Sequence, residues 1–305
     1  MKKNTIMKIK KHMLKVINKF SYKQYLDFRR NSMVAAGHFY SPIVSIDSIR
    51  KREVDIWSKA NIEGLPGIDL QTDEQLKLID CFSDFYKEMP FKPTKQADTR
   101  YYFENEYYSY SDGIILYSMI RYFQPKKIIE IGSGFSSALM LDTNELFFDN
   151  QINLTFIEPN PGRLLSVMRH NDKSSSRIIQ SDVQQVELEN FKQLGPGDIL
   201  FVDSTHVVKT GSDVNCIIFD ILPLLKSGVL IHFHDVFYPF EYPKRWVFQG
   251  RSWNENYFLR AFLMDNDKYE IKLFVDYLHL HYKKAFENLP LAYNNTGGNL
   301  WLLKK

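Results

Sequence analysis

Short apolar runs alternate with amphipathic stretches from about residue 96 to the C-terminus. Apolar runs bounded by turn residues predict buried strands, and apolar positions three to four apart predict helices. The predicted strands span 127–131, 153–158, 177–180, 198–203, 228–235, 269–275 and 298–303. The predicted helices of this part span 111–123, 136–147, 162–170, 213–225 and 254–264. Strands and helices in alternation predict parallel pairing with right-handed crossovers.

The first 95 residues follow a different pattern. Apolar residues spaced among lysines predict a helix over about 5–35, and a second helix begins at Thr72. Pro90, Pro93 and the charged stretch 95–100 resemble a boundary. We therefore expect a helical N-terminal extension or cap over residues 1–95 and a main α/β domain over residues 96–305.

Charge and cysteine content add a few limits. The net charge of +3 favours no particular partner, but lysines and arginines crowd the first 30 residues against Asp27 alone. Such a block is typical either of a solvated helix face or of a segment that contacts anionic lipid or nucleic acid. Two distant cysteines, with no signal peptide and no apolar run of about 20 residues, indicate a cytoplasmic protein. Peripheral contact with the inner membrane through the basic N-terminus stays open.

A glycine turn stands between the strand predicted over 127–131 and the next helix. Gly132 and Gly134 allow the backbone to pass close to a ligand. Ser137 occupies the place of the third glycine in a dinucleotide fingerprint, which makes a bound pyrophosphate less favoured. Glu130 is expected to face the ligand cleft, where its carboxylate suits a cationic or amino-bearing ligand. Glu158, at the end of the next strand, is placed to accept both hydroxyls of a ribose.

These segments carry a family resemblance. The sequence Glu-Ile-Gly-Ser-Gly-Phe-Ser-Ser at 130–137, followed by Phe-Ile-Glu-Pro at 156–159, resembles the first and second motifs of class I S-adenosylmethionine-dependent methyltransferases. It is most similar to a bacterial subgroup often encountered beside polysaccharide genes. The similarity runs from Gly-His-Phe-Tyr-Ser-Pro at 37–42 to Gly-Arg-Ser-Trp-Asn-Glu at 250–255. It implies a Rossmann-like methyltransferase fold, in which a seven-stranded, mostly parallel sheet carries helices on both faces.

The resemblance also implies S-adenosylmethionine as cofactor, bound by residues 96–305. Glu130 would lie near the methionine end, and Glu158 would bind the ribose. Asp182 would lie near the adenine, although a helix N-cap explains it equally well. The full set expected around the cofactor is Glu130, Gly132, Ser133, Gly134, Phe135, Glu158, Asp182 and Asp203.

Acids and histidines follow the strands predicted over 198–203 and 228–235. Because ligands bind outside the carboxyl ends of parallel strands, Asp203, His206, His234 and Asp235 are expected to face one cleft and are the candidate catalytic residues. In one interpretation the cluster holds a divalent cation, magnesium or manganese, with Asp203, His234 and Asp235 as the central ligands. In another, His206 or His234 is a general base without a metal. In a third, these side chains only cap turns and fill the core.

The predicted function is methylation of a hydroxyl group on a sugar, a glycan or another small acceptor. The aromatic stretch from Asp235 to Glu255 suits such an acceptor, or forms a lid over the cofactor. The alternatives are a nicotinamide-dependent oxidoreductase on the same fold and a non-catalytic binding module. No nucleic-acid partner is expected, because the main domain has no basic stripe with interleaved aromatic residues. The sequence leaves the oligomeric state open.

Overall fold

The computed structural model describes residues 22, 23, 26 and 30–305, and these divide into two compact units at Glu53/Val54. The helix predicted over 5–35 lies largely outside the described residues, although Tyr22, Arg30 and Asn31 are helical. The second unit begins at Val54, well before the boundary predicted near residue 95. A functional division at residue 95 therefore stays a prediction, since residues 54–95 pack within the same unit as the sheet.

The first unit has little regular structure among its described residues. A tight loop follows residue 36, where Gly37 (φ +80°) donates to the carbonyl of Ile43 over 2.9 Å. The rings of His38, Phe39 and Tyr40 contact one another along this loop. Helix α2 (Ile46–Lys51) follows, and the Ser45 side chain caps its N-terminus.

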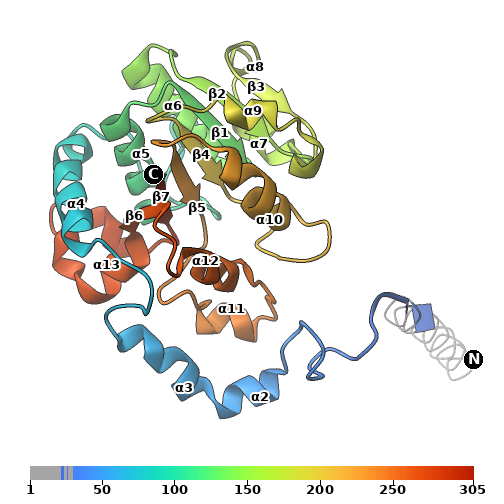
Figure 1. Ribbon diagram of the computed structural model, residues 1–305. Helices are drawn as coiled ribbons and strands as arrows, with labels where there is room; N and C mark the ends of the chain where they lie inside the picture. Colours follow the sequence, from blue (N-terminus) through green and yellow to red (C-terminus); the bar gives the residue numbers. More distant parts are fainter. Residues whose placement is uncertain (1–21, 24–25, 27–29) are drawn as a thin grey trace, which may run out of the picture. The chain divides into compact units, whose positions relative to one another are not determined.

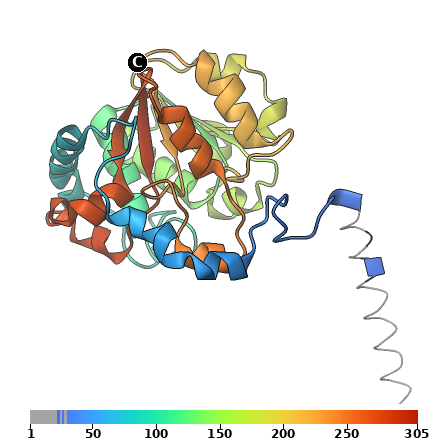
Figure 2. The same cartoon turned by 60° about the horizontal axis from the view of Figure 1, so that its bottom comes forward.

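The second unit contains one seven-stranded sheet (Figures 1 and 2). Its strands are β1 (Lys127–Ile131), β2 (Asn153–Ile157), β3 (Arg177–Ile179), β4 (Ile199–Val202), β5 (Leu230–Phe233), β6 (Tyr269–Phe274) and β7 (Leu300–Lys304). The spatial order is β3-β2-β1-β4-β5-β7-β6, and only β7 pairs antiparallel to its two neighbours. All seven predicted strands are present, so the predicted fold class is confirmed.

Helices cover both faces of this sheet (Figure 1). The helices before β3 are α3 (Glu53–Trp57), α4 (Thr72–Lys87), α5 (Tyr110–Phe123), α6 (Phe135–Phe148), α7 (Gly162–Val167) and α8 (Asp172–Ser175). Those after it are α9 (Glu189–Lys192), α10 (Asp213–Cys216), α11 (Lys244–Phe248), α12 (Glu255–Leu263) and α13 (Val275–His281). Helices α4, α5 and α6 pack against one another on one face, and α10 and α12 lie on the other.

The core explains why the central strands read as continuous apolar runs. Every residue of β4 and β5 is buried, because helices cover the sheet on both sides. Helix α4 joins this core through Leu78, Ile79 and Phe82 and packs on α5 and β6. This packing is why residues 72–87 belong to the second compact unit.

Several short helices, among them α8, α9 and α11, were not predicted, and two further differences concern longer segments. The helix predicted over 213–225 divides into α10, a π-helical turn (Ile217–Ile221) and a 3₁₀ turn (Leu222–Leu224) that contains Pro223. Helix α13 was not predicted, because it follows β6 directly with no turn residue between them. No helix in the described part of the chain is long and apolar enough to cross a membrane.

Candidate active site

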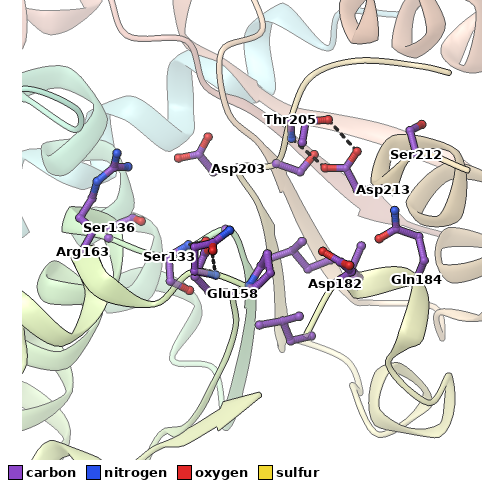
Figure 3. A pocket seen from close by; sticks show the side chains of 18 of the residues that line it. Ser133, Ser136, Glu158, Arg163, Asp182, Gln184, Asp203, Thr205, Ser212 and Asp213 are labelled. Atoms are coloured by element: carbon purple, nitrogen blue, oxygen red, sulfur yellow. Dashed lines mark hydrogen bonds between the residues drawn. The ribbon is translucent and has the colours of Figure 1, made fainter. Parts of the chain in front are cut away.

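A cavity of about 510 Å³ opens at the carboxyl ends of β1, β2 and β4 (Figure 3). Parallel strands place the residues that follow them at one edge of the sheet, so segments far apart in sequence meet here. Of the predicted cofactor residues, those lining the cavity are Gly132, Ser133, Gly134, Phe135, Glu158, Asp182 and Asp203. Tyr107 and Tyr108, which precede the first strand, line it as well.

The turn between β1 and α6 requires its first glycine. Gly132 has φ +82°, and a Cβ atom at this position would overlap the carbonyl oxygen of Asp203. A Cβ on Gly134 would lie 2.8 Å from Cδ of Arg163, whose side chain is long enough to move. Gly132 therefore allows the end of β4 to approach the turn closely.

Ser137 fills the place that a third glycine has in dinucleotide-binding turns. Its hydroxyl accepts from the amide of Gly134 over 2.9 Å and donates to Glu130. A serine side chain therefore already accepts from the backbone amide at the start of α6. In dinucleotide-binding folds, a glycine at this position leaves room for a pyrophosphate at the helix N-terminus. This arrangement disfavours the nicotinamide alternative.

Two acids face the cavity from the neighbouring strands. The carboxylate of Glu158 accepts from the amide of Ser133 over 3.2 Å and from that of Asn160 over 2.8 Å. A carboxylate has about four lone-pair sites, so Glu158 keeps capacity for two ribose hydroxyls. Asp182 is exposed in the cavity wall and makes no capping hydrogen bond to the described turn that follows it, Val183–Gln185. The N-cap explanation of Asp182 therefore lacks its hydrogen bond.

Glu130 differs from its expected position. Its side chain is fully buried beneath the turn, outside the cavity wall, where the hydroxyls of Ser136 and Ser137 donate to it. Burial raises the pKa of Glu130 to about 8, although these hydrogen bonds oppose the shift. Successive side chains along β1 point to opposite faces of the sheet. That of Glu130 points to the face covered by α6, so its carboxylate lies against the first turn of this helix.

The cavity residues fit S-adenosylmethionine. Glu158 and Asp182 supply acceptors for an adenosine, and the Gly132 turn gives a close backbone approach. On the other side the ring of Phe135 stacks on Tyr107, and the guanidinium of Arg163 lies 3.8 Å from the Tyr107 ring centroid. Arg163 was not predicted from the sequence, and only its place in the helix after Glu158 could have indicated it.

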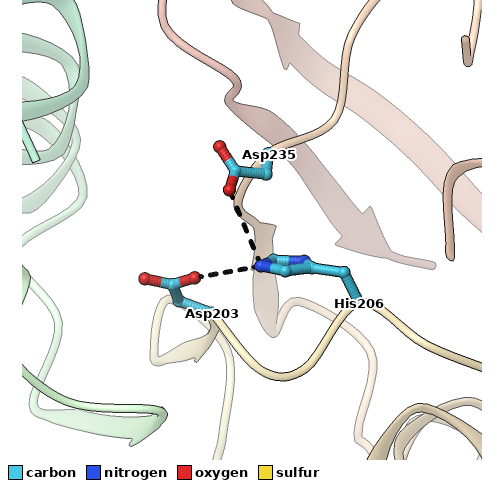
Figure 4. A group of neighbouring side chains, drawn as sticks. All are labelled: Asp203, His206 and Asp235. Carbon is cyan, nitrogen blue, oxygen red and sulfur yellow. Dashed lines mark ion pairs between the residues drawn. The ribbon is translucent and has the colours of Figure 1, made fainter. Parts of the chain in front are cut away.

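A cluster of titratable side chains adjoins the cavity at Asp203 (Figure 4). Nε2 of His206 lies 3.5 Å from a carboxylate oxygen of Asp203 and 3.6 Å from one of Asp235. One ligand atom from each of the three residues falls within 4.8 Å of the others. Two carboxylates and an imidazole form a donor set suited to manganese, iron or zinc, and the carboxylates also suit magnesium.

His206 is held from behind by the start of α12. Its Nδ1 lies 2.9 Å from Oε2 of Glu255, whose side chain is 1% exposed. Its backbone carbonyl accepts from the amides of Asn254 and Glu255, and the Trp253 ring packs 4.4 Å from its imidazole. Burial by itself lowers the pKa of His206, but its hydrogen bonds with Asp203 and Glu255 outweigh burial and raise that pKa well above its usual value.

His234 lies at the edge of this cluster. Its Nε2 is 3.5 Å from Asp235, and its ring packs 5.0 Å from that of Tyr108. The three residues whose ligand atoms lie close together are Asp203, His206 and Asp235, whereas we expected His234 as the histidine ligand. His234 is not part of this group because β5 ends at Phe233. Beyond the strand, the His234 ring packs against Tyr108, and Asp235 reaches the cluster.

Glu255 is, besides Arg163, a candidate site residue to which the sequence assigned no role. It lies 49 positions beyond His206 and is the first residue of α12. An acid in the first turn of a helix is a common stabilising feature, so its position gave no signal of a contact with a histidine.

One comparison with known proteins names an activity. A family profile described as "Methyltransferase domain" matches residues 129–236. A protein of Archaeoglobus fulgidus, described only as uncharacterized, is 32% identical over 162 residues, which cover 52% of this chain and 72% of that protein.

Two solved structures are similar at a greater distance. One is the S-adenosylhomocysteine-bound methyltransferase PaMTH1 of Podospora anserina, at 16% identity and a TM-score of 0.42 over 86% of this chain and 98% of that one. The other is a putative caffeoyl-CoA O-methyltransferase from Staphylococcus aureus, at 17% identity and a TM-score of 0.41 over 85% of this chain and 100% of that one. Similarity this remote does not bear on function.

The matched profile covers the glycine turn, Glu158 and Asp203, which line the cavity, and the end of β5, where Asp235 of the adjoining cluster lies. The sheet order, with its antiparallel β7, is the arrangement that the family resemblance implied. Residues 129–236 of this chain therefore belong to the methyltransferase domain family, and the chain shares a family with its archaeal relative.

Proposed function

We propose that this methyltransferase is an O-methyltransferase that uses a divalent cation to bind and activate the hydroxyl group of its acceptor. One observation carries the proposal: Asp203, His206 and Asp235 converge within 4.8 Å beside the cofactor cavity. Asp203 belongs both to the cavity wall and to the cluster. A cation bound there would lie next to the transferable methyl group.

The charge of the cluster supports a cation over a lone histidine base. Three carboxylates, from Asp203, Asp235 and Glu255, lie within 3.6 Å of the His206 ring nitrogens. Even a protonated imidazole leaves this partly buried group with an excess of negative charge, and uncompensated charge withdrawn from water is costly. A divalent cation would supply the missing charge and would be held by Asp203, Asp235 and His206.

The protein's part in the reaction is to bind and orient the reactants. S-adenosylmethionine supplies the methyl group: its S–CH₃ bond breaks as the acceptor oxygen bonds to the methyl carbon, S-adenosylhomocysteine leaves, and the hydroxyl proton passes to water. A bound cation would lower the pKa of the hydroxyl. Glu158 and Asp182 would hold the adenosine part, Asp203 would lie between donor and acceptor, and Glu255 would keep the imidazole of His206 in place. Positioning of this kind supplies much of the rate enhancement in a direct displacement.

The acceptor is proposed to be a sugar, a glycan or another small hydroxyl compound. Support comes from the half-buried aromatic side chains Trp246 and Trp253 next to the cluster, since ring faces with a few polar groups suit such ligands. A cytoplasmic location also stays a proposal, supported by two free cysteines. Contact of the basic N-terminus with anionic lipid is a prediction that falls on residues outside the described range.

Manganese binding tests the proposal without a known acceptor. We expect the protein saturated with S-adenosylhomocysteine to bind one Mn²⁺, measured by electron paramagnetic resonance, and Asp235→Asn to weaken binding at least tenfold. Asp220→Asn, a change of the same chemistry at an exposed site, should leave Mn²⁺ affinity unchanged. If the wild-type protein binds no Mn²⁺, or if Asp235→Asn binds it equally well, the cation mechanism is wrong and a metal-free histidine base replaces it.

A further inference from the structure

The segment between α11 and α12 presents an arginine in a fixed position. Gly250 has φ +84°, and the backbone amide of Arg251 donates to the carbonyl of Trp246 over 3.2 Å. The guanidinium carbon of Arg251 lies 4.2 Å from the centroid of the Trp246 ring and 5.0 Å from that of Trp253. Two indole rings therefore orient this side chain, and cation–π contacts of this kind are favourable.

This arginine is close to the reactive cluster. Trp253 packs against the His206 imidazole at 4.4 Å, so a single indole ring contacts both Arg251 and a candidate cation ligand. Trp246 meets the ring of Phe237, in the loop that leaves β5 after Asp235, at 5.1 Å. The two tryptophans thus connect Arg251 to the cluster through direct ring contacts.

The charge of Arg251 lacks a partner within the part of the chain that the structure describes. Arg251 is exposed, and among the described residues its guanidinium makes neither an ion pair nor a side-chain hydrogen bond. A guanidinium offers five donors in a planar fork that matches carboxylate and phosphate oxygens. Because the rings already restrict its rotamers, less side-chain entropy is lost when such a group binds.

We propose that Arg251 binds an oxyanion of the methyl acceptor, so that the substrate is a hydroxyl compound that carries a carboxylate or a phosphate group. The inference rests on the proposed function, because it assumes that the acceptor hydroxyl is bound at the Asp203–His206–Asp235 cluster. Trp253 then separates the anionic group, at Arg251, from the three carboxylates around His206. The positive charge would compensate for the repulsion that an anionic acceptor meets near those acids.

Three probes with one hydroxylated scaffold test this assignment: glucose, glucuronate and glucose 6-phosphate. Each is titrated into the full chain saturated with S-adenosylhomocysteine, and tryptophan fluorescence reports binding because Trp246 and Trp253 flank Arg251. We expect at least one anionic probe to bind about tenfold or more tightly than glucose, as a charge-assisted bidentate contact predicts. Preference for glucuronate or for glucose 6-phosphate would tell a carboxylate substrate from a phosphate substrate.

Matched variants separate the role of Arg251 from general charge. Arg251→Gln should remove the preference for the anionic probe, and Arg251→Lys should retain part of it. Arg245→Gln, the same change at an exposed arginine of α11, should keep the preference. No preference in the wild-type protein, or an equal preference in Arg251→Gln, would overturn the proposal. S-adenosylhomocysteine and Mn²⁺ titrations of the same samples show whether the proposed function fails as well, since neither depends on Arg251.

Discussion

His206 and Asp235 both have left-handed backbone conformations, with φ values of +60° and +57°. Such conformations are uncommon for residues other than glycine and cost on the order of 1–3 kcal/mol each. They persist here because the backbone around each residue is held: the carbonyl of His206 by the amides of α12, and the chain after Asp235 by a hydrogen bond from Val236 to Gly298. Both outliers lie at the proposed cation site, where a fixed geometry of ligands is needed.

The contact between Glu255 and His206 predicts a loss of metal affinity on mutation. Glu255→Gln removes the charged acceptor at Nδ1 of His206, which orients the ring toward Asp203 and Asp235. Loss of such a supporting carboxylate typically weakens metal binding 10- to 100-fold. Calorimetric Mn²⁺ titration checks this, and the affinity for S-adenosylhomocysteine should stay unchanged. A variant with normal Mn²⁺ affinity would show that Glu255 is merely structural.

The buried position of Glu130 predicts a pH-dependent stability. Burial raises its pKa in the folded protein to about 8, above the ordinary value of 4.5, so folding opposes its ionisation. The stability that depends on the neutral form is complete below about pH 4.5 and is lost as the pH rises through about 8. Glu130→Gln should therefore gain stability relative to the wild type as the pH rises from 5 to 8, by up to about 1.4 kcal/mol per pH unit.

Urea unfolding at several pH values measures this difference. Glu187→Gln, at an exposed position, serves as the control and should keep a constant difference from the wild type across this range. A constant difference for Glu130→Gln as well would mean that Glu130 is not held in its neutral form by burial.

The positions of cofactor residues were predictable where they depend only on neighbouring residues in the sequence. Gly132, Gly134 and Glu158 follow strands at short, regular spacing, and each of them lines the cavity as expected. Glu130 was misplaced because the pattern gives only its position on β1, while the hydroxyls of α6 decide where its carboxylate points. The pairing of His206 with Glu255 depends on the docking of α12, which no local pattern records.

At the scale of elements, strand ends and the turns after them build the site. The loop 295–299 before β7 is held by Asp112 of α5, whose carboxylate accepts from the amide of Gly298 and from the Asn295 and Asn299 side chains. The same loop contacts the chain after β5, because the carbonyl of Gly298 accepts from the amide of Val236. A Cβ on Gly298 would lie 2.8 Å from Cα of Asp235. The antiparallel strand β7 therefore helps to set the position of a candidate cation ligand.

The turn between β1 and α6 predicts a specific sensitivity to an added methyl group. Gly132→Ala should destabilise the protein and abolish S-adenosylhomocysteine binding, because its Cβ would overlap the Asp203 carbonyl and its φ is positive. Gly64→Ala is the matched control: φ is +94°, but the new Cβ would meet nothing within 4 Å among the described residues. Thermal melting should show a much larger loss for Gly132→Ala, whereas equal losses would mean that only the backbone conformation matters.

The strands and most helices of the sheet were predictable because their periodicity is local. The exact extent of β5 was not, since His234 continues the ring-bearing pattern of His232 and Phe233 one residue past the last paired position, Phe233. The spatial order of the strands was not predictable in this way, because pairing between distant segments leaves no periodic signal in the sequence.

At the scale of the whole molecule, every residue of the cavity and of the cluster belongs to the unit Val54–Lys305. We therefore expect a chain shortened to residues 54–305 to fold and to bind S-adenosylhomocysteine with nearly the affinity of the full chain. A chain shortened to 96–305 should unfold more readily, because it lacks α4 and the buried side chains of Leu78, Ile79 and Phe82. Thermal melting and calorimetry of the two chains check this, and equal stability would support the boundary predicted near residue 95.

The central claim is that the cavity beside Gly132 binds S-adenosylmethionine with Glu158 at the ribose. The most direct test is calorimetric titration of the full chain with S-adenosylhomocysteine, for the wild-type protein and for Glu158→Gln. The account predicts that one molecule binds to the wild type and that affinity falls about tenfold or more in the variant, since a half-buried charged acceptor for two hydroxyls is lost. No binding to the wild type, or equal binding to both proteins, would contradict it.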